Sequence, residues 1–253
     1  VVELPDTAQV LGVWAGRPPD LAVTTSENGW VHCWRVPGGQ RVGVPFQAPD
    51  PLNIVAISPN AQHVAMASGG LLQSITIWDV ATGTRRAGPF KPGGDLFDLA
   101  YSPDGKRLAV CSWDGHATLL DAETCLPVTD RMRHRRGIGR SRFSPDNRWL
   151  VTASWDKTAR LWDARTGVAA SPVLHHAGYV MHSEFHPQSS LLATAGGDHT
   201  IRLWQLDAPG SASLVLKHSN TVATGSFSQD GTQILTADFA GFVQVQDGDR
   251  RHL

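Results

Sequence analysis

A repeat with a constant spacing runs along this chain and limits the folds that it can adopt. Six segments share a strand-like alternation that ends at a Trp or at the residue in its place: SENGWVHCWR, SGGLLQSITIWD, SWDGHATLLD, SWDKTARLWD, GGDHTIRLWQ and DFAGFVQVQD. The aligned positions are Trp34, Trp78, Leu120, Trp162, Trp204 and Gln246, and subtracting neighbours gives 44, 42, 42, 42 and 42 residues. A fixed period of about 20–50 residues indicates one supersecondary unit that is stacked several times.

A second motif keeps the same period. The segments ISPNAQHVA, YSPDGKRLA, FSPDNRWLV, FHPQSSLLA and FSQDGTQIL each precede the Trp position of their copy. In the fourth copy the pattern predicts a strand that ends at Phe143, a Ser-Pro-Asp-Asn turn, strands over 149–154 and 158–163, and an outer strand over about 168–174. Four short antiparallel strands cannot bury both faces of their sheet alone, whereas stacked copies can.

These motifs resemble those of the WD-repeat β-propeller family over essentially the whole chain. The resemblance implies an all-β fold of four-stranded antiparallel blades, with a single domain over residues 1–253. The six repeats would form either a six-bladed ring or six blades of a seven-bladed or longer array. The first residue is Val rather than Met, so we expect a fragment of a longer protein, in which Val1–Leu4 ends an outer strand.

The resemblance also implies a buried polar network of His, Ser or Thr, Asp and Trp in each blade. The fourth copy has the complete set: His134, Ser154, Asp156 and Trp162. The fifth copy has Gly196 at the Ser position, and the sixth has Ala240 and Gln246 at the Asp and Trp positions. A partly satisfied network stabilises less, so we expect blade four to be the most stable and blade six the least.

Large aromatic residues are predicted on one rim of the propeller, called the top. The residue before the turn Asp points outward there, and it is Trp113, Trp155 and Phe239 in copies three, four and six. Tyr179, from the loop before the innermost strand of copy five, should lie on the same face. Exposed aromatic side chains are typical anchors for a protein partner. In the alternative interpretation, each ring folds down and packs on a neighbouring blade.

Residues 130–142 (DRMRHRRGIGRSR) contain six arginines, and Arg133, Arg135 and Arg136 fall near the top rim. They could bind an acidic or phosphorylated peptide or a nucleic-acid backbone, or they could form a solvated face. The run has no interleaved aromatic residues for base stacking, and the net charge of the chain is -1. Nucleic acid is therefore the less favoured partner.

The sequence offers little sign of catalytic or metal chemistry. The His-rich run HHAGYVMHSEFHP contains a cluster with metal-ligand residue types: His175, His176, His182, Glu184 and His186. The resemblance gives His176 a structural position, so no metal or cofactor is predicted. No GxSxG, GxxxxGK[ST] or HExxH motif occurs, which favours a non-catalytic protein. The alternative is a ligand-binding or enzymatic propeller with a channel site formed by Asp98, Arg140, His182 and Glu184.

Together these features predict a non-catalytic scaffold that presents its top rim to a protein or peptide. The segments TARLWDARTG and GVAASPVLHH resemble bacterial WD-repeat arrays attached to serine/threonine kinases or other signalling domains, which implies a recruitment module in a signalling protein. The three cysteines form no CxxC pair, which favours a reducing compartment such as the cytoplasm. No run approaches the roughly 18 apolar residues of a membrane span, so none is expected in this segment.

Overall fold

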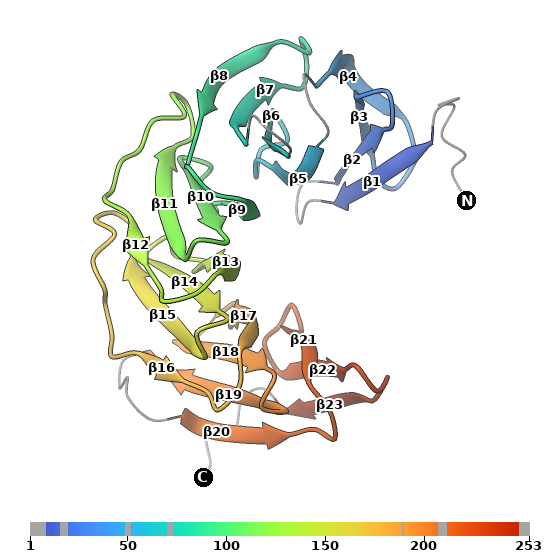
Figure 1. The fold of residues 1–253 in the computed structure, drawn as a ribbon. Helices are drawn as coiled ribbons and strands as arrows, with labels where there is room; N and C mark the ends of the chain where they lie inside the picture. The colour runs from blue at the N-terminus through green and yellow to red at the C-terminus, as the bar shows by residue number, and fades with distance from the viewer. Residues whose placement is uncertain are drawn as a thin grey trace. The chain divides into compact units, whose positions relative to one another are not determined.

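The computed structural model describes residues 9–15, 20–48, 52–69, 73–188, 190–206 and 212–247. The described residues form 23 strands in six antiparallel sheets, each made from consecutive strands (Figure 1). Five sheets have four strands and the last has three. We number these sheets as blades one to six in chain order. The predicted all-β fold of stacked four-stranded blades is confirmed for blades one to five, and blade six has three described strands.

The chain divides into two compact units. Unit 1 comprises the described part of residues 1–110 together with 119–128. It contains blade one, with β1 (Val10–Ala15), β2 (Leu21–Ser26), β3 (Trp30–Arg35) and β4 (Arg41–Gln47), and blade two, with β5 (Leu52–Ile57), β6 (His63–Ser68), β7 (Ile75–Asp79) and β8 (Arg85–Phe90). Blade three consists of β9 (Leu96–Tyr101), β10 (Arg107–Ser112), β11 (His116–Asp121) and β12 (Met132–Arg133), and its strands contribute residues to both units.

Unit 2 comprises residues 111–118 and the described part of 129–253. Blade four consists of β13 (Ile138–Phe143), β14 (Trp149–Ser154), β15 (Thr158–Asp163) and β16 (Leu174–His175). Blade five consists of β17 (Val180–Phe185), β18 (Leu191–Gly196), β19 (Thr200–Gln205) and β20 (Ala212–Lys217). Blade six consists of β21 (Val222–Phe227), β22 (Gln233–Asp238) and β23 (Val243–Asp247).

The predicted strands of the fourth copy agree with the structure except for the outermost one. Strands over 149–154 and 158–163 are confirmed, and a strand ends at Phe143. The outer strand predicted over about 168–174 is wrong in extent, because regular pairing is confined to Leu174–His175, after an isolated bridge between Trp162 and Ala169. Pro172 lies in the unpaired stretch and has no N–H to donate to a ladder.

A Ser followed two residues later by Asp or Asn forms the same turn in four of the copies. In blade four, Ser144 Oγ donates to Asp146 Oδ1 at 2.5 Å, and the Arg148 N–H donates to the same oxygen at 3.0 Å. Equivalent bonds surround Asn60, Asp104 and Asp230. The repeated motif is therefore explained by local hydrogen bonding within the turn.

Apolar side chains fill the space between successive blades within each unit. In unit 2, one cluster joins blades four and five, and it contains Val151, Leu161, Val180, Leu192 and Trp204. A second cluster joins blades five and six, and it contains Ala193, Ile201, Leu203, Val222 and Ile234. Successive blades of a unit thus bury the faces that they turn toward each other, as the stacking argument predicts. Val1–Leu4, the predicted end of an outer strand, lie outside the described residues.

Candidate interaction surface

A chain of hydrogen bonds links four polar side chains in blade four. The Trp162 indole N–H donates to Thr152 Oγ1 at 2.8 Å, and His134 Nε2 lies 2.7 Å from the same hydroxyl. His134 Nδ1 lies 3.1 Å from Asp156 Oδ2. These contacts assign the tautomer: Nδ1–H donates to the carboxylate, and Nε2 accepts the Thr152 hydroxyl proton. His134 and Thr152 are buried, so the bonds fix the loop before β13 against the sheet.

The prediction that Ser154 belongs to this network is wrong. Ser154 Oγ points instead to the backbone carbonyls of Arg136 and Gly137, at 3.1 and 3.0 Å, and accepts from the Asp156 N–H. Ser154 is the last residue of β14 and therefore faces the loop. Thr152, two residues earlier on the same face, takes the network position. The prediction was correct for His134, Asp156 and Trp162.

Blade five has the same complete network, because its Thr194 corresponds to Thr152. Thr194 Oγ1 lies 2.7 Å from both His176 Nε2 and the Trp204 indole nitrogen. His176 Nδ1 lies 3.1 Å from the Asp198 carboxylate. Gly196 therefore removes nothing from the network, and the expectation that only blade four is complete is wrong.

Blade six has a partial network, in which Asp238 supplies the carboxylate from a different position. His218 Nε2 lies 2.9 Å from Thr236 Oγ1, and the buried carboxylate of Asp238 lies 3.5 Å from His218 Nδ1. Asp238 is at the position of Ser154, so a carboxylate approaches from a site two residues earlier than in blade four. His218 Nδ1 forms no hydrogen bond with any described residue, so Asp238 acts on it only as a nearby charge. Gln246 supplies no indole, as predicted.

Burial and hydrogen bonding set the charge state of these networks. Burial lowers the pKa of His134 and His176 despite the opposing effect of Asp156 and Asp198. Burial alone would raise the pKa of Asp198, but hydrogen bonds from Thr200 and His176 outweigh it and lower the pKa to about 2. The networks therefore hold a neutral imidazole and an ionised carboxylate at neutral pH.

Three aromatic rings form a continuous row on unit 2, which we call the aromatic row. Trp113 and Trp155 meet edge to face with ring centroids 4.9 Å apart, and Trp155 stacks on Tyr179 at 5.6 Å. They come from the β10–β11 turn, the β14–β15 turn and the loop before β17. Trp113 is 44% exposed, and Trp155 and Tyr179 are each 37% exposed. The rings therefore pack on one another and remain open to solvent, which combines the two interpretations drawn from the sequence.

The three rings lie directly against glycines, whose missing side chains leave room for them, a role that sequence reasoning missed. A Cβ at Gly137 would lie 2.8 Å from the Trp113 ring, and one at Gly197 would lie 2.8 Å from the Tyr179 ring. A Cβ at Gly139 would lie 3.2 Å from Trp155 Nε1. The GIG segment at Gly137–Gly139 therefore leaves room for the rings of Trp113 and Trp155.

The arginines and Phe239 differ in their relation to the row. The Arg135 N–H donates to Asp156 and the Arg136 carbonyl accepts from Ser154, so the backbone of this loop is fixed close to Trp113 and Trp155. The side chains of Arg133, Arg135 and Arg136 are exposed and form no ion pair within the described part of the chain. Phe239 is 62% exposed on blade six and makes no ring contact with another described residue.

Several of the remaining chemical candidates lie on or near β17, and the Arg140 guanidinium is near enough to His182 to lower the pKa of that imidazole. Among the described residues, no three His, Cys, Asp or Glu side chains are grouped so that they could hold a metal ion. His182 is buried on β17, while Glu184 accepts a hydrogen bond from Ser226 at 3.1 Å. His186 is part of a turn, where Nδ1 accepts from the Gln188 N–H. No helix within the described ranges has the length and apolar character needed to cross a membrane.

Comparisons with known proteins agree with this architecture. The family model described as "WD domain, G-beta repeat" matches residues 90–121, 127–163 and 171–205. The C-terminal WD40 domain of Sif2 superposes with a TM-score of 0.79 at 21% identity, over 97% of this chain and 68% of that chain. At this identity the likeness concerns the fold alone.

Curated relatives are similar in sequence to part of this chain. Mouse (Mus musculus) coronin-7 is 30% identical over 43% of this chain and 12% of its own length. Human (Homo sapiens) nucleoporin Nup43 is 29% identical over 52% of this chain and 36% of its own length. The match thus spans a minor part of each relative. Residues 90–121, 127–163 and 171–205 therefore match WD repeats, and the sheets of the chain have the fold of a WD40 domain.

Proposed function

We propose that this chain is a non-catalytic protein-interaction domain that binds a protein or peptide through the aromatic row. The observation that carries the proposal is the contact of Trp113, Trp155 and Tyr179 across three blades, with each ring more than a third exposed. Rigid, solvent-exposed aromatic side chains supply large contact areas at little cost in side-chain entropy, and they dominate many protein interfaces.

The surroundings of the row favour an acidic or phosphorylated segment in the partner. Arg135 and Arg136 lie in the loop that Asp156 and Ser154 fix beside the rings. A guanidinium group forms two parallel hydrogen bonds with a carboxylate or phosphate. Because the loop backbone is already ordered, binding requires little further ordering of it.

The family relationship supports an interaction role. WD-repeat proteins such as coronin-7 and nucleoporin Nup43 belong to a group that typically acts as protein-interaction scaffolds. A finer hypothesis is recruitment within a bacterial signalling protein, and it rests on the likeness of residues 158–175 to bacterial arrays.

The test is affinity capture from a lysate of the source organism with the wild type and Trp113→Ala/Trp155→Ala. Trp30→Ala is the matched control, because Trp30 is 38% exposed but lies outside the row. We expect a protein that the wild type and the control retain and that the double variant loses. Melting curves on all three chains establish that the variants are folded. Equal retention by all three would reject the proposal.

Arg135→Gln/Arg136→Gln tests the charge of the partner. We expect this variant to bind the captured partner about tenfold more weakly at low salt, with a flatter dependence on salt concentration. Unchanged affinity and salt dependence would show that the arginines form a solvated face and that the rings act alone.

A further inference from the structure

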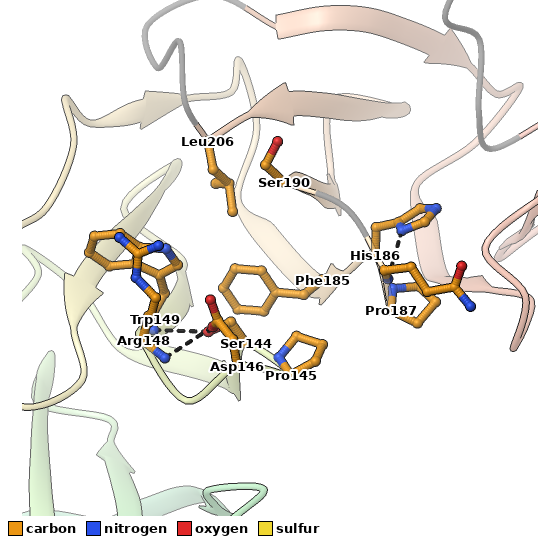
Figure 2. A pocket seen from close by; sticks show the side chains of 11 residues that line it. Ser144, Pro145, Asp146, Arg148, Trp149, Phe185, His186, Pro187, Ser190 and Leu206 are labelled. Atoms are coloured by element: carbon orange, nitrogen blue, oxygen red, sulfur yellow. Dashed lines mark hydrogen bonds between the residues drawn. The ribbon is translucent and has the colours of Figure 1, made fainter.

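Residues of blades four and five line a cavity of about 410 Å³, and Figure 2 shows their side chains. The cavity lies at the end of the strands away from the aromatic row. It lies between the β13–β14 turn and the β17–β18 turn. β14 begins at Trp149 in the cavity wall and ends at Ser154 below the row, so about 17 Å separates the two places. The apolar part of the wall consists of Pro145, Trp149, Phe185, Pro187 and Leu206. The volume lies in the range of about 300–1,000 Å³ that is usual for ligand pockets.

The cavity carries one positive charge with no anionic partner. The Arg148 guanidinium lies over the Trp149 ring at 5.1 Å from its centroid and forms no ion pair with any described residue. His186 adds no charge, because its Nδ1 accepts from the Gln188 N–H and its Nε2 donates to the Gly231 carbonyl at 2.9 Å. This bonding identifies a neutral ring.

The carboxylate in the cavity wall belongs to Asp146, and its hydrogen bonds stabilise the β13–β14 turn. Asp146 Oδ1 already accepts from Ser144 and from the Arg148 N–H. The same acceptor occurs as Asn60, Asp104 and Asp230 in other copies. The carboxylate is therefore explained by the fold, whereas the guanidinium of Arg148 is not.

The Arg148–Trp149 pair occurs in blade four alone among copies with this turn. The residues that follow the turn acceptor in the same positions are Gln62 and His63, Lys106 and Arg107, and Thr232 and Gln233. All three turns form the same backbone bonds without an Arg–Trp pair. Folding therefore does not require the pair, and its cation–π contact fixes an exposed guanidinium at the mouth of an apolar cavity.

We propose that this cavity binds a short acidic peptide segment, separately from the aromatic row. An apolar side chain of the peptide enters between Trp149, Phe185 and Leu206. A neighbouring Asp or Glu carboxylate of the peptide pairs with Arg148. The positive charge of Arg148 therefore favours acidic over basic peptides. The chain thereby has two peptide sites at opposite ends of blade four.

The test is a selection of random heptapeptides displayed on phage against the immobilised chain. Each enriched peptide is then synthesised, and its Kd is measured by fluorescence anisotropy for the wild type, Arg148→Gln, Trp149→Leu, Lys106→Gln and Trp113→Ala/Trp155→Ala. Gln62 and Leu191 occupy the corresponding positions of other copies, so the first two substitutions suit the turn. Lys106→Gln is the matched control, since it removes an exposed cation from the same turn position of blade three.

We expect enriched peptides in which an apolar residue adjoins Asp or Glu. Arg148→Gln and Trp149→Leu should each weaken their binding about tenfold, and Lys106→Gln should leave it unchanged. The proposal is wrong if the peptides are basic or proline-rich, or if no peptide binds below about 1 mM. It is also wrong if every peptide loses affinity in Trp113→Ala/Trp155→Ala but keeps it in Arg148→Gln, a result that would leave the proposed function intact.

Discussion

Blades four and six are copies of one 42-residue unit and lie in the same unit of the molecule, yet their faces differ. Val151 of blade four is fully buried, and its counterpart Leu235 in blade six is 48% exposed. Ala159 and Leu161 are buried in the same way, while their counterparts Val243 and Val245 are exposed. The repeat motif thus determines strands and turns, and the neighbouring blade determines whether a face is buried.

The polar network of blade four is also more complete than that of blade six. The Thr152 hydroxyl forms hydrogen bonds with both His134 and Trp162. The Thr236 hydroxyl bonds to His218, and blade six has no indole N–H for it to accept. Asp238 approaches His218 from a neighbouring position at a longer distance. The blade with the more exposed apolar side chains therefore also has the less complete network.

The largest expected effect contrasts Val151→Ser with Leu235→Ser. The first leaves a cavity and a buried hydroxyl between blades four and five, and it should lower the free energy of unfolding by about 3–4 kcal/mol. The second changes an exposed side chain and should cost at most about 0.5 kcal/mol. Urea denaturation of both variants measures the difference, and similar losses would show that Leu235 is covered in solution.

A smaller contrast is expected between Thr152→Val and Thr236→Val. Removal of the Thr152 hydroxyl leaves a ring nitrogen of His134 and the Trp162 N–H buried without partners, which should cost about 2–3 kcal/mol. Thr236→Val leaves only the His218 nitrogen and should cost about 1 kcal/mol. The same denaturation experiment applies. A greater loss for Thr236→Val would reverse the ranking of the two networks.

The smallest expected effect concerns pH. Burial and the nearby Arg140 and Arg142 guanidinium groups lower the pKa of His182 to about 4. The unfolded chain binds this proton below about pH 6.5, so the contribution is complete above that pH and is lost as the pH falls toward 4. Blade six has Thr224 at the equivalent position. His182→Thr should therefore reduce the loss of stability between pH 7.5 and 4.5 by about 1–2 kcal/mol. An unchanged slope in denaturation curves would contradict this assignment.

Much of the fold follows from the sequence because it depends on short-range patterns. The strands over 149–154 and 158–163 follow from alternation between two turns, and the Asp146 turn follows from hydrogen bonds within five residues. The outermost strand of blade four could not be predicted with the same accuracy, since it pairs over two residues only.

The candidate site was less predictable because it depends on distances between blades. The sequence identified Trp113, Trp155 and Tyr179, but their mutual contact arises from three different segments. Aligned positions also misplaced Ser154 and missed Asp238, because a side chain two residues away on the same strand face can reach the same partner. The cavity beside Arg148 is formed by two turns that are far apart in the sequence.

The glycines beneath the aromatic row limit how this surface could be transferred to another protein. Trp113 is in the third repeat, and the glycine beneath it, Gly137, precedes the innermost strand of the fourth. A single repeat transferred as a cassette would therefore carry a ring without its support, or a support without its ring. A graft that preserves the surface must be continuous from Trp113 to Gly197, two full periods of the chain, so the unit that can be exchanged is larger than the unit that is repeated.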